Sequence, residues 1–266
     1  MPFLPAGRRR RTTTNAPTPS CRLPRRMLPG FALSVLRQRT RSFSHDATRA
    51  VAGLRPPVEV AGRGNVPPQG PCLVTCNHYS PEWFPSWWLT LTISAAVAAQ
   101  RTSLAEVDIH WIMAAAWRYP AGTWRGRLVT PATWWAFSRV GRVYGFVLMP
   151  PMPPDPREVE DRAWAVRRAL RMARELAQVG GMMGLSPEGI AVRDAALVEP
   201  PPGVGEFIAH LVCAGLPVLP VGVREVGGRL RVSFGPLFKP ELPARREERD
   251  RSVTGQVMEA IGRQLA

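Results

Sequence analysis

The stretch CLVTCNH, residues 72–78, decides the fold of this chain. Its first five residues are apolar or small, and they follow a turn over residues 62–70 that is rich in Gly, Asn and Pro. This pattern is typical of a short buried strand. A mainly apolar segment follows from about Pro85 and is long enough for a helix. A buried strand followed by a helix is the unit from which parallel α/β sheets are built.

The same alternation continues along the chain. Apolar runs predict further strands at 58–61, 109–114, 143–148, 182–185 and 218–223, and periodic segments predict helices at 131–140, 156–178 and 205–214. The pair Gly227-Gly228 predicts a hairpin turn into a last strand at 230–234. We therefore expect an α/β domain over 56–240, with a mostly parallel central sheet flanked by helices. Residues 241–266 are predicted to form a C-terminal helix.

Charge is unevenly distributed over the 266 residues. The net charge is +15, and residues 1–50 hold eleven arginines against one acid, Asp46. Residues 1–27 show no hydrophobic period and are predicted to be a disordered basic tail. Its composition fits a transit peptide better than a signal peptide, because no continuous apolar stretch follows the charges.

Residues 28–55 are predicted to form an amphipathic N-terminal helix, in which apolar residues alternate with arginines. Such a helix can lie at a lipid interface, or it can pack on the domain with its arginines in solvent. No stretch reaches the roughly 18 uncharged apolar residues of a membrane-spanning helix. We expect a cytoplasmic protein that is peripheral to the inner face of the membrane.

The basic excess indicates an anionic partner, either lipid headgroups or nucleic acid. A membrane lipid surface is the expected partner and nucleic acid is not, because the body lacks the aromatic and basic pattern of a nucleic-acid-binding module. The four cysteines, at positions 21, 72, 76 and 213, form no CxxC pair and have no histidine at zinc-ligand spacing. No metal site is expected.

Polar residues follow two of the predicted strands. Asn77 and His78 come directly after the strand at 72–76, and the segment from Ser186 through Pro187 and Glu188 to Gly189 follows the strand at 182–185. Sites in parallel sheets gather at the carboxyl ends of strands. A neutral imidazole in such a loop can take a proton from a hydroxyl near neutral pH. Each motif alone is also compatible with a structural histidine and an ordinary turn with a solvated acid.

Taken together, the two motifs, about 110 residues apart, and the segment LPVLPV at 216–221 resemble the 1-acyl-glycerol-3-phosphate and glycerol-3-phosphate acyltransferases. The resemblance to this glycerolipid acyltransferase family covers about residues 56–240. It implies an acyltransferase-like fold in which His78 is the general base for a hydroxyl that attacks an acyl thioester. The donor substrate would be acyl-CoA or acyl-carrier protein, and the acceptor a lysophospholipid or related lipid, with no cofactor. The resemblance assigns Asn77, Ser186, Pro187, Glu188 and Gly189 to substrate binding.

The chain departs from the family pattern at two places. Trp83 stands where the family has the aspartate that orients the histidine, and the nearest carboxylate is Glu82. On a helical turn, Glu82 would share a face with His78 and could replace that aspartate as a catalytic residue. Pro85 instead favours a loop through Phe84.

The second departure concerns the arginine that holds the acceptor phosphate in the family. Pro150 or a neighbour occupies its place, and Arg142 and Arg193 are candidates to compensate as substrate-binding residues, with Arg139 as a further candidate. The alternative for each of them is an ordinary surface arginine. These departures leave an alternative function, a catalytically silent lipid-binding member of the same fold.

Overall fold

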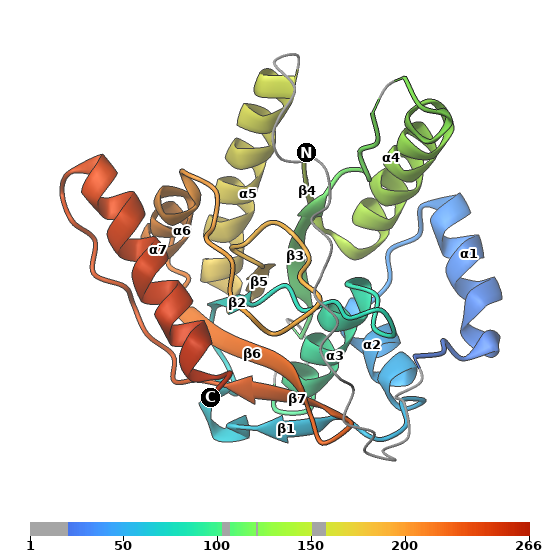
Figure 1. The fold of residues 1–266 in the computed structure, drawn as a ribbon, viewed down its shortest axis with the longest axis horizontal. Coiled ribbons are helices and arrows are strands. Elements are labelled where there is room, and N and C mark those ends of the chain that lie inside the picture. The colour runs from blue at the N-terminus through green and yellow to red at the C-terminus, as the bar shows by residue number, and fades with distance from the viewer. Residues whose placement is uncertain (1–20, 103–106, 121, 151–157) are drawn as a thin grey trace, which may run out of the picture.

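The computed structural model describes residues 21–102, 107–120, 122–150 and 158–266. Its centre is a seven-stranded sheet in the order β1-β7-β6-β2-β5-β3-β4 (Figure 1). The strands are β1 (Glu59–Ala61), β2 (Cys72–Cys76), β3 (Ile109–Ala114), β4 (Val147–Met149), β5 (Met182–Leu185), β6 (Val218–Val226) and β7 (Arg229–Phe234). The helices are η1 (Arg25–Met27), α1 (Leu28–Arg37), α2 (Phe43–Val51), η2 (Arg63–Asn65), α3 (Trp87–Ala98), α4 (Trp124–Tyr144), α5 (Val159–Val179), α6 (Val204–Cys213) and α7 (Arg246–Arg263).

The predicted α/β fold with a mostly parallel sheet is confirmed. Every strand pair is parallel except β6 with β7, which forms the predicted antiparallel hairpin. Gly227 and Gly228 turn this hairpin with φ of 56° and 76°, values that glycine adopts without steric cost. Because β1 pairs in parallel with β7, these two strands run opposite to the other five.

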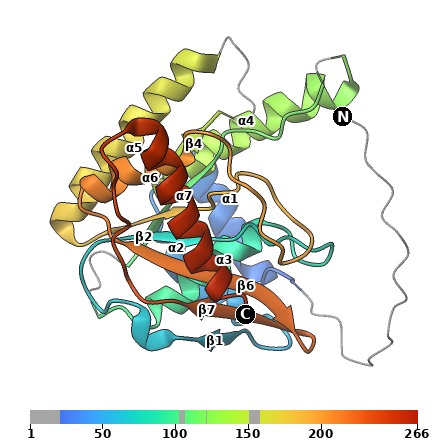
Figure 2. The same ribbon diagram turned by 60° about the vertical axis from the view of Figure 1, so that its left-hand side comes forward.

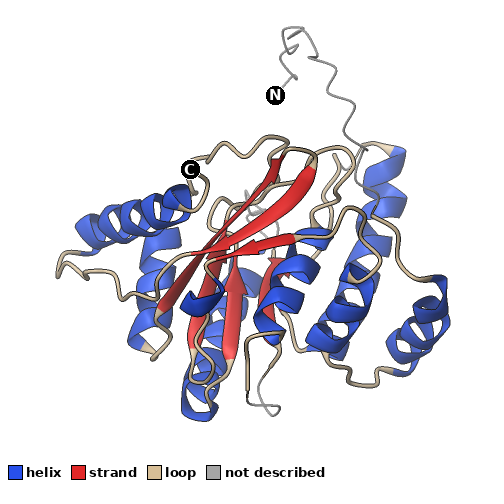
Figure 3. Cartoon of the chain, turned by 90° about the horizontal axis from the view of Figure 1, so that it is seen from below, coloured by secondary structure: helices blue, strands red, loops and turns tan. Residues whose placement is uncertain are grey.

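Helices cover both faces of the sheet (Figure 3). One core contains buried residues of α1, α2, α3 and α4, and the other contains those of α5, α6 and α7. Strand β2 contributes Val74 to the first core and Leu73 to the second. Successive side chains of a strand point to opposite faces, so a strand buried on both sides is apolar throughout.

The predicted N-terminal helix over 28–55 is two helices in the structure. Helix α1 ends at Gln38, which adopts a left-handed conformation with φ of 53°. Helix α2 starts after Ser42, whose hydroxyl accepts the backbone N–H of His45 at 3.1 Å. Phe43 and Ala47 of α2 are buried in the first core. Of the two interpretations, packing on the domain therefore applies to α2.

The predicted disordered tail over 1–27 differs from the structure in its last residues. Residues 1–20 lie outside the described residues. Cys21, Leu23 and Met27 are partly buried against the first core. The described chain therefore packs on the domain ahead of α1, because these apolar side chains contact the first core.

Helix α4 is longer than predicted at both ends. It begins at Trp124, where the hydroxyl of Thr123 accepts the N–H of Gly126 at 3.1 Å, and it contains Pro131. It continues through Tyr144 and ends at Gly145, which has a φ of 68°. The strand predicted over 143–148 is therefore reduced to β4 at 147–149, since the helix C-cap occupies its first residues.

The other helices follow the predictions more closely. The predicted start of α5, at Asp155 and Pro156, lies outside the described residues. The predicted C-terminal helix is α7, which buries Val253, Val257 and Ile261 in the second core and so belongs to the same domain. Among the described helices, none has both the length and the apolar character needed to cross a bilayer.

Candidate functional site

His78 lies directly after β2, at the carboxyl end of the sheet, where two loops run side by side. The backbone N–H of Val192 donates to the carbonyl of His78 at 2.8 Å, and that of Ser80 donates to the carbonyl of Val192 at 2.7 Å. Tyr79 and Val192 thus form a parallel bridge. The loop after β2 and the loop after β5 are therefore hydrogen-bonded to each other.

Glu188 joins the same two loops through its carboxylate. One oxygen accepts the backbone N–H of His78 at 2.5 Å, and the other accepts that of Val198 at 2.8 Å. Burial raises the pKa of Glu188, and the two N–H donors partly oppose this rise because they favour the charged form. Gly189, with a φ of 67°, permits the tight turn that follows. Glu188 is thus buried and bonded, unlike the solvated acid of an ordinary turn.

Asn77 is fixed to the neighbouring strand β6. Its side-chain amide donates to the carbonyl of Val223 at 2.9 Å, and its side-chain oxygen accepts the N–H of Val223 at 2.8 Å. The residue is buried. Because both polar groups of this side chain are bonded to one backbone unit, Asn77 fixes the start of the loop that carries His78. Its predicted role in substrate binding stays a prediction.

The imidazole of His78 is partly buried at this edge. Burial lowers the pKa of His78, and a contact with the backbone of Ile190 partly opposes the change. Nδ1 is buried and has no hydrogen-bond partner among the described residues, so the Ile190 contact does not satisfy this atom. A lowered pKa keeps the ring neutral at pH 7, which is the form that can accept a proton.

Glu82 and Arg193 form an ion pair at the exposed rim of these loops. Their closest atoms, Oε1 and Nη1, are 3.1 Å apart, and both side chains are exposed. Residues 82–84 lie in turn and bend conformations, and the N–H of Phe84 donates to the carbonyl of Pro81 at 3.0 Å. The predicted helical contact between Glu82 and His78 is therefore not formed, and the alternative of a loop through Phe84 is correct. The catalytic role of Glu82 stays a prediction without a contact to support it.

Trp83 stands at the position where the resemblance leads one to expect an aspartate. Its indole N–H donates to a carboxylate oxygen of Glu225 at 3.1 Å, and its ring packs against Phe84 at 5.4 Å between centroids. The side chain thereby joins the loop to the end of β6. It carries no group that could accept the N–H of an imidazole.

Ser186 and Pro187 lie at the end of β5. The hydroxyl of Ser186 is 3.2 Å from the thiol of Cys76, and Pro187 is buried. Burial raises the pKa of Cys76 to about 12, so this sulfur stays a protonated thiol and is not a nucleophile at pH 7.

Arg142 is not brought to this cluster by any contact of the described residues. Its guanidinium donates to the side-chain oxygen of Gln38 at 3.4 Å, where α4 meets the end of α1. Arg139 donates to the carbonyl of Leu36 at 3.1 Å in the same region. Of the predicted phosphate-binding arginines, only Arg193 lies at the rim of the His78 loops.

Residue types did not reveal the part played by Val192, Val198 and Val223, whose backbone groups bond to the loops. Any residue except proline supplies a backbone N–H, so such contacts leave no mark on residue type. Among the described residues, no group of three or more His, Cys, Asp or Glu could hold a metal ion.

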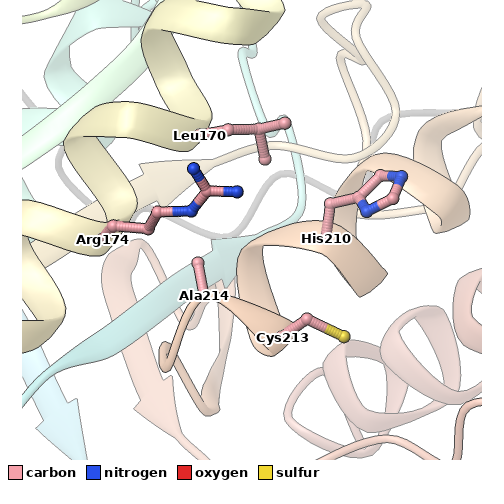
Figure 4. A pocket seen from close by; sticks show the side chains of 5 residues that line it. All are labelled: Leu170, Arg174, His210, Cys213 and Ala214. Atoms are coloured by element: carbon pink, nitrogen blue, oxygen red, sulfur yellow. The ribbon is translucent and has the colours of Figure 1, made fainter.

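A small hollow of about 110 Å³ lies between α5 and α6, away from these loops. It is lined by Leu170, Arg174, His210, Cys213 and Ala214 (Figure 4). None of the residues bonded around His78 lines it. The hollow is therefore separate from the candidate site.

The chain is similar in structure to solved proteins. The crystal structure of the 1-acyl-sn-glycerophosphate (LPA) acyltransferase PlsC from Thermotoga maritima aligns with 89% of this chain and 87% of its own, at 17% identity and a TM-score of 0.49. No protein-family model matches the chain, and no curated protein matches it either.

Proposed function

We propose that the chain transfers a fatty acyl group from a thioester to the hydroxyl of a lipid, with His78 as general base. The observation that supports this most is the bond between the two motifs: the Glu188 carboxylate accepts the backbone N–H of His78. Two segments that resemble separate blocks of one enzyme family are thus hydrogen-bonded to each other, which supports a shared site. That site is at the carboxyl end of a parallel sheet, where such sites occur.

The chemistry requires a base, because an alcohol is a poor nucleophile until its proton is removed. The neutral imidazole of His78 accepts the proton of the acceptor hydroxyl while the oxygen attacks the thioester carbonyl. The tetrahedral intermediate then collapses, the carbon–sulfur bond breaks, and the thiolate takes the proton from the imidazolium. The lowered pKa of His78 supports the first step, because it keeps the base unprotonated at pH 7.

The substrates in this proposal are acyl-CoA or acyl-carrier protein as donor and a lysophospholipid or related lipid as acceptor. No cofactor takes part in the transfer. A peripheral position on the cytoplasmic face of the membrane would give the enzyme access to such acceptors. Glu82 has no part in this mechanism, since its carboxylate is paired with Arg193.

The test is transfer from labelled acyl-CoA to a panel of lysolipids. We expect His78→Ala to lower turnover by about 10²–10⁴-fold, the usual contribution of a general base. The control is His210→Ala, which removes an exposed histidine of α6 that is in contact with Glu206 and remote from the loops. Turnover by His78→Ala equal to that of the unchanged protein would contradict the proposal, provided that both variants unfold at the same temperature.

A second candidate is a catalytically silent lipid-binding protein, and the surroundings of His78 support it. Glu82 is bonded elsewhere, and Trp83 stands in the place of the orienting carboxylate. Losing that carboxylate costs about 10⁴-fold in the serine-protease template. The same assay discriminates, because binding of acyl-CoA or lysolipid without any product would favour this candidate.

A further inference from the structure

Helix α4 exposes an apolar stripe on its outward side. Trp124, Leu128, Pro131 and Trp135 follow each other at spacings of four, three and four residues, which places them on one helical face. Trp124 is 65% exposed, Leu128 67% and Trp135 50%. The buried residues of α4 are all in its last turn, from Gly141 to Tyr144. Figure 2 shows the helix extending away from the sheet.

Arginines accompany this stripe. The guanidinium of Arg125 is 5.5 Å from the ring centroid of Trp124, and that of Arg139 is 4.7 Å from the ring of Trp135. Arg127 is a further exposed arginine of the helix, and residues 124–144 contain no acid. The outward face of a helix on a soluble domain is ordinarily polar. Here it is apolar and aromatic, with cations beside the rings.

Helix α1 extends the same surface. Arg139 donates to the carbonyl of Leu36 at the end of α1, so the two helices are in contact there. Leu33 and Leu36 are exposed, and residues 21–45 contain no acid. We define the α4–α1 surface by Trp124, Leu128, Trp135, Leu33 and Leu36. An exposed apolar patch of this kind on a single domain indicates a binding surface.

Helix α5 provides a contrast within the same molecule. Trp164 is 55% exposed, and its ring lies under the guanidinium of Arg168 at 5.7 Å, so a stacked tryptophan and arginine also occur there. Glu160 and Asp161 precede it in the same helix. Scattered exposed apolar residues among both charges are normal on soluble proteins. The α4–α1 surface differs because neither helix contains an acid and its apolar residues on α4 share one helical face.

We propose that the α4–α1 surface binds the interface of a lipid bilayer that contains anionic headgroups. Tryptophan rings favour the headgroup level of a membrane, and arginines beside them can reach anionic phosphates. The charge of the surface is complementary to such a bilayer. This inference goes beyond acyl transfer and does not rest on it, since it concerns binding alone.

The position of the surface also agrees with the candidate site. Helix α4 connects β3 to the parallel strand β4, so it begins beyond the carboxyl end of β3. His78 follows β2 at that same end of the sheet. If the proposed acyl transfer is correct, docking through Trp124 and Leu128 would bring the bilayer to the edge at which the base lies.

The test is flotation of the full chain with vesicles of phosphatidylcholine, with and without about one-third phosphatidylglycerol. We expect binding to the anionic vesicles, and we expect the double variant Trp124→Ser with Trp135→Ser to bind about tenfold more weakly or worse. Serine and tryptophan have similar helix propensities, so the helix itself should persist. The matched control is Trp164→Ser, which should bind like the unchanged protein.

A second variant tests the charge separately. Arg125→Glu with Arg127→Glu should abolish the preference for anionic vesicles. Residues 1–20, with their four arginines, are present in every variant, so their contribution to vesicle binding is the same throughout.

The proposal is overturned if the tryptophan variant floats as well as the unchanged chain, or if Trp164→Ser loses as much binding. It is also overturned if the tryptophans are instead required for binding double-stranded DNA or for self-association in sedimentation. Because these assays do not measure acyl transfer, failure of the membrane-binding proposal is distinguishable from failure of the proposed function.

Discussion

The loops around His78 and the α4–α1 surface use polar and apolar side chains in opposite ways. At the loops, Asn77 and Glu188 are buried, and each places its polar atoms on backbone groups of another segment. On α4, Trp124 and Trp135 are exposed, and each lies beside an arginine of the same helix. A buried polar group stabilises one geometry only when its bonds are complete. An exposed apolar stripe adds little to folding and is available to a partner.

Of the substitutions considered, Asn77→Ala should lower the free energy of unfolding most. It leaves the N–H and the carbonyl of Val223 without their side-chain partner in a buried position. We expect a loss of about 3 kcal/mol in the free energy of unfolding, measured by urea denaturation. Asn65→Ala is the control, because its amide donates a single bond, to the carbonyl of Phe234, from an exposed residue. Equal losses of unfolding free energy in the two variants would contradict the idea that the bonds of Asn77 stabilise the fold more because they are buried.

Glu188→Gln should have the next largest effect. A neutral amide can accept only through its oxygen, whereas the carboxylate now accepts from both His78 and Val198. The second N–H would face an NH₂ group, and we expect a loss of about 2 kcal/mol. Glu199→Gln, in the same loop at an exposed position, should change stability by less than about 0.5 kcal/mol. Thermal unfolding of the pair measures the difference, and identical midpoints would show that the carboxylate does not hold the loops.

Glu82→Gln should have a small effect, because its ion pair with Arg193 is exposed. Exposed ion pairs contribute about 0–1 kcal/mol to the free energy of unfolding. We also expect turnover to stay within about threefold of the unchanged protein, since this carboxylate makes no bond to His78. Kinetic assays of Glu82→Gln beside Arg193→Gln would check this. A loss of several orders of magnitude in the first variant alone would restore Glu82 as the partner of the base.

The smallest effect on folding is expected on α4. Trp124→Ser with Trp135→Ser should leave the free energy of unfolding within about 0.5 kcal/mol, because exposed substitutions rarely change it by more. Urea denaturation in the absence of lipid measures this. Trp88→Ser is the opposing case, since its ring is fully buried in the first core. A large loss from the α4 variant would mean that its tryptophans are part of the core after all.

Much of the sheet could be predicted from the sequence, because a strand that is buried on both faces is apolar without interruption. β2 and β5 follow this rule. The β6–β7 hairpin was instead indicated by Gly227 and Gly228, because β7 alternates exposed or half-buried polar residues with buried apolar ones. The division between α1 and α2 could not be predicted, because Gln38 has no preference for the left-handed conformation that it adopts. The start of α4 was missed because Pro131 suggests a first turn, although the helix begins seven residues earlier at Trp124.

The contacts among the predicted site residues could be foreseen only in part, because Arg142 lies on Gln38 and Glu82 pairs with Arg193 instead of His78. The order of the motifs indicated that His78 and Glu188 belong together, and the structure joins them. It joins them through the backbone N–H of His78, which residue types do not reveal. The spacing of His78 and Glu82 suggested a contact, but spacing along the chain has this meaning only within a helix. Residues 82–84 form a turn and not a helix, so the spacing of four residues does not bring Glu82 to His78.

During synthesis on the ribosome, β2 is made well before the two strands with which it pairs. β2 is complete at Cys76, but its neighbours β5 and β6 begin only at Met182 and Val218. The interval is longer still for β1, because it pairs with residues 231–233 of β7, which are synthesised near the end of the chain. During that interval an apolar strand has both edges unpaired, the condition under which nascent chains associate wrongly. Synthesis of this protein should therefore depend on chaperones until its last third has emerged, and its folding rate should be limited by long-range strand pairing.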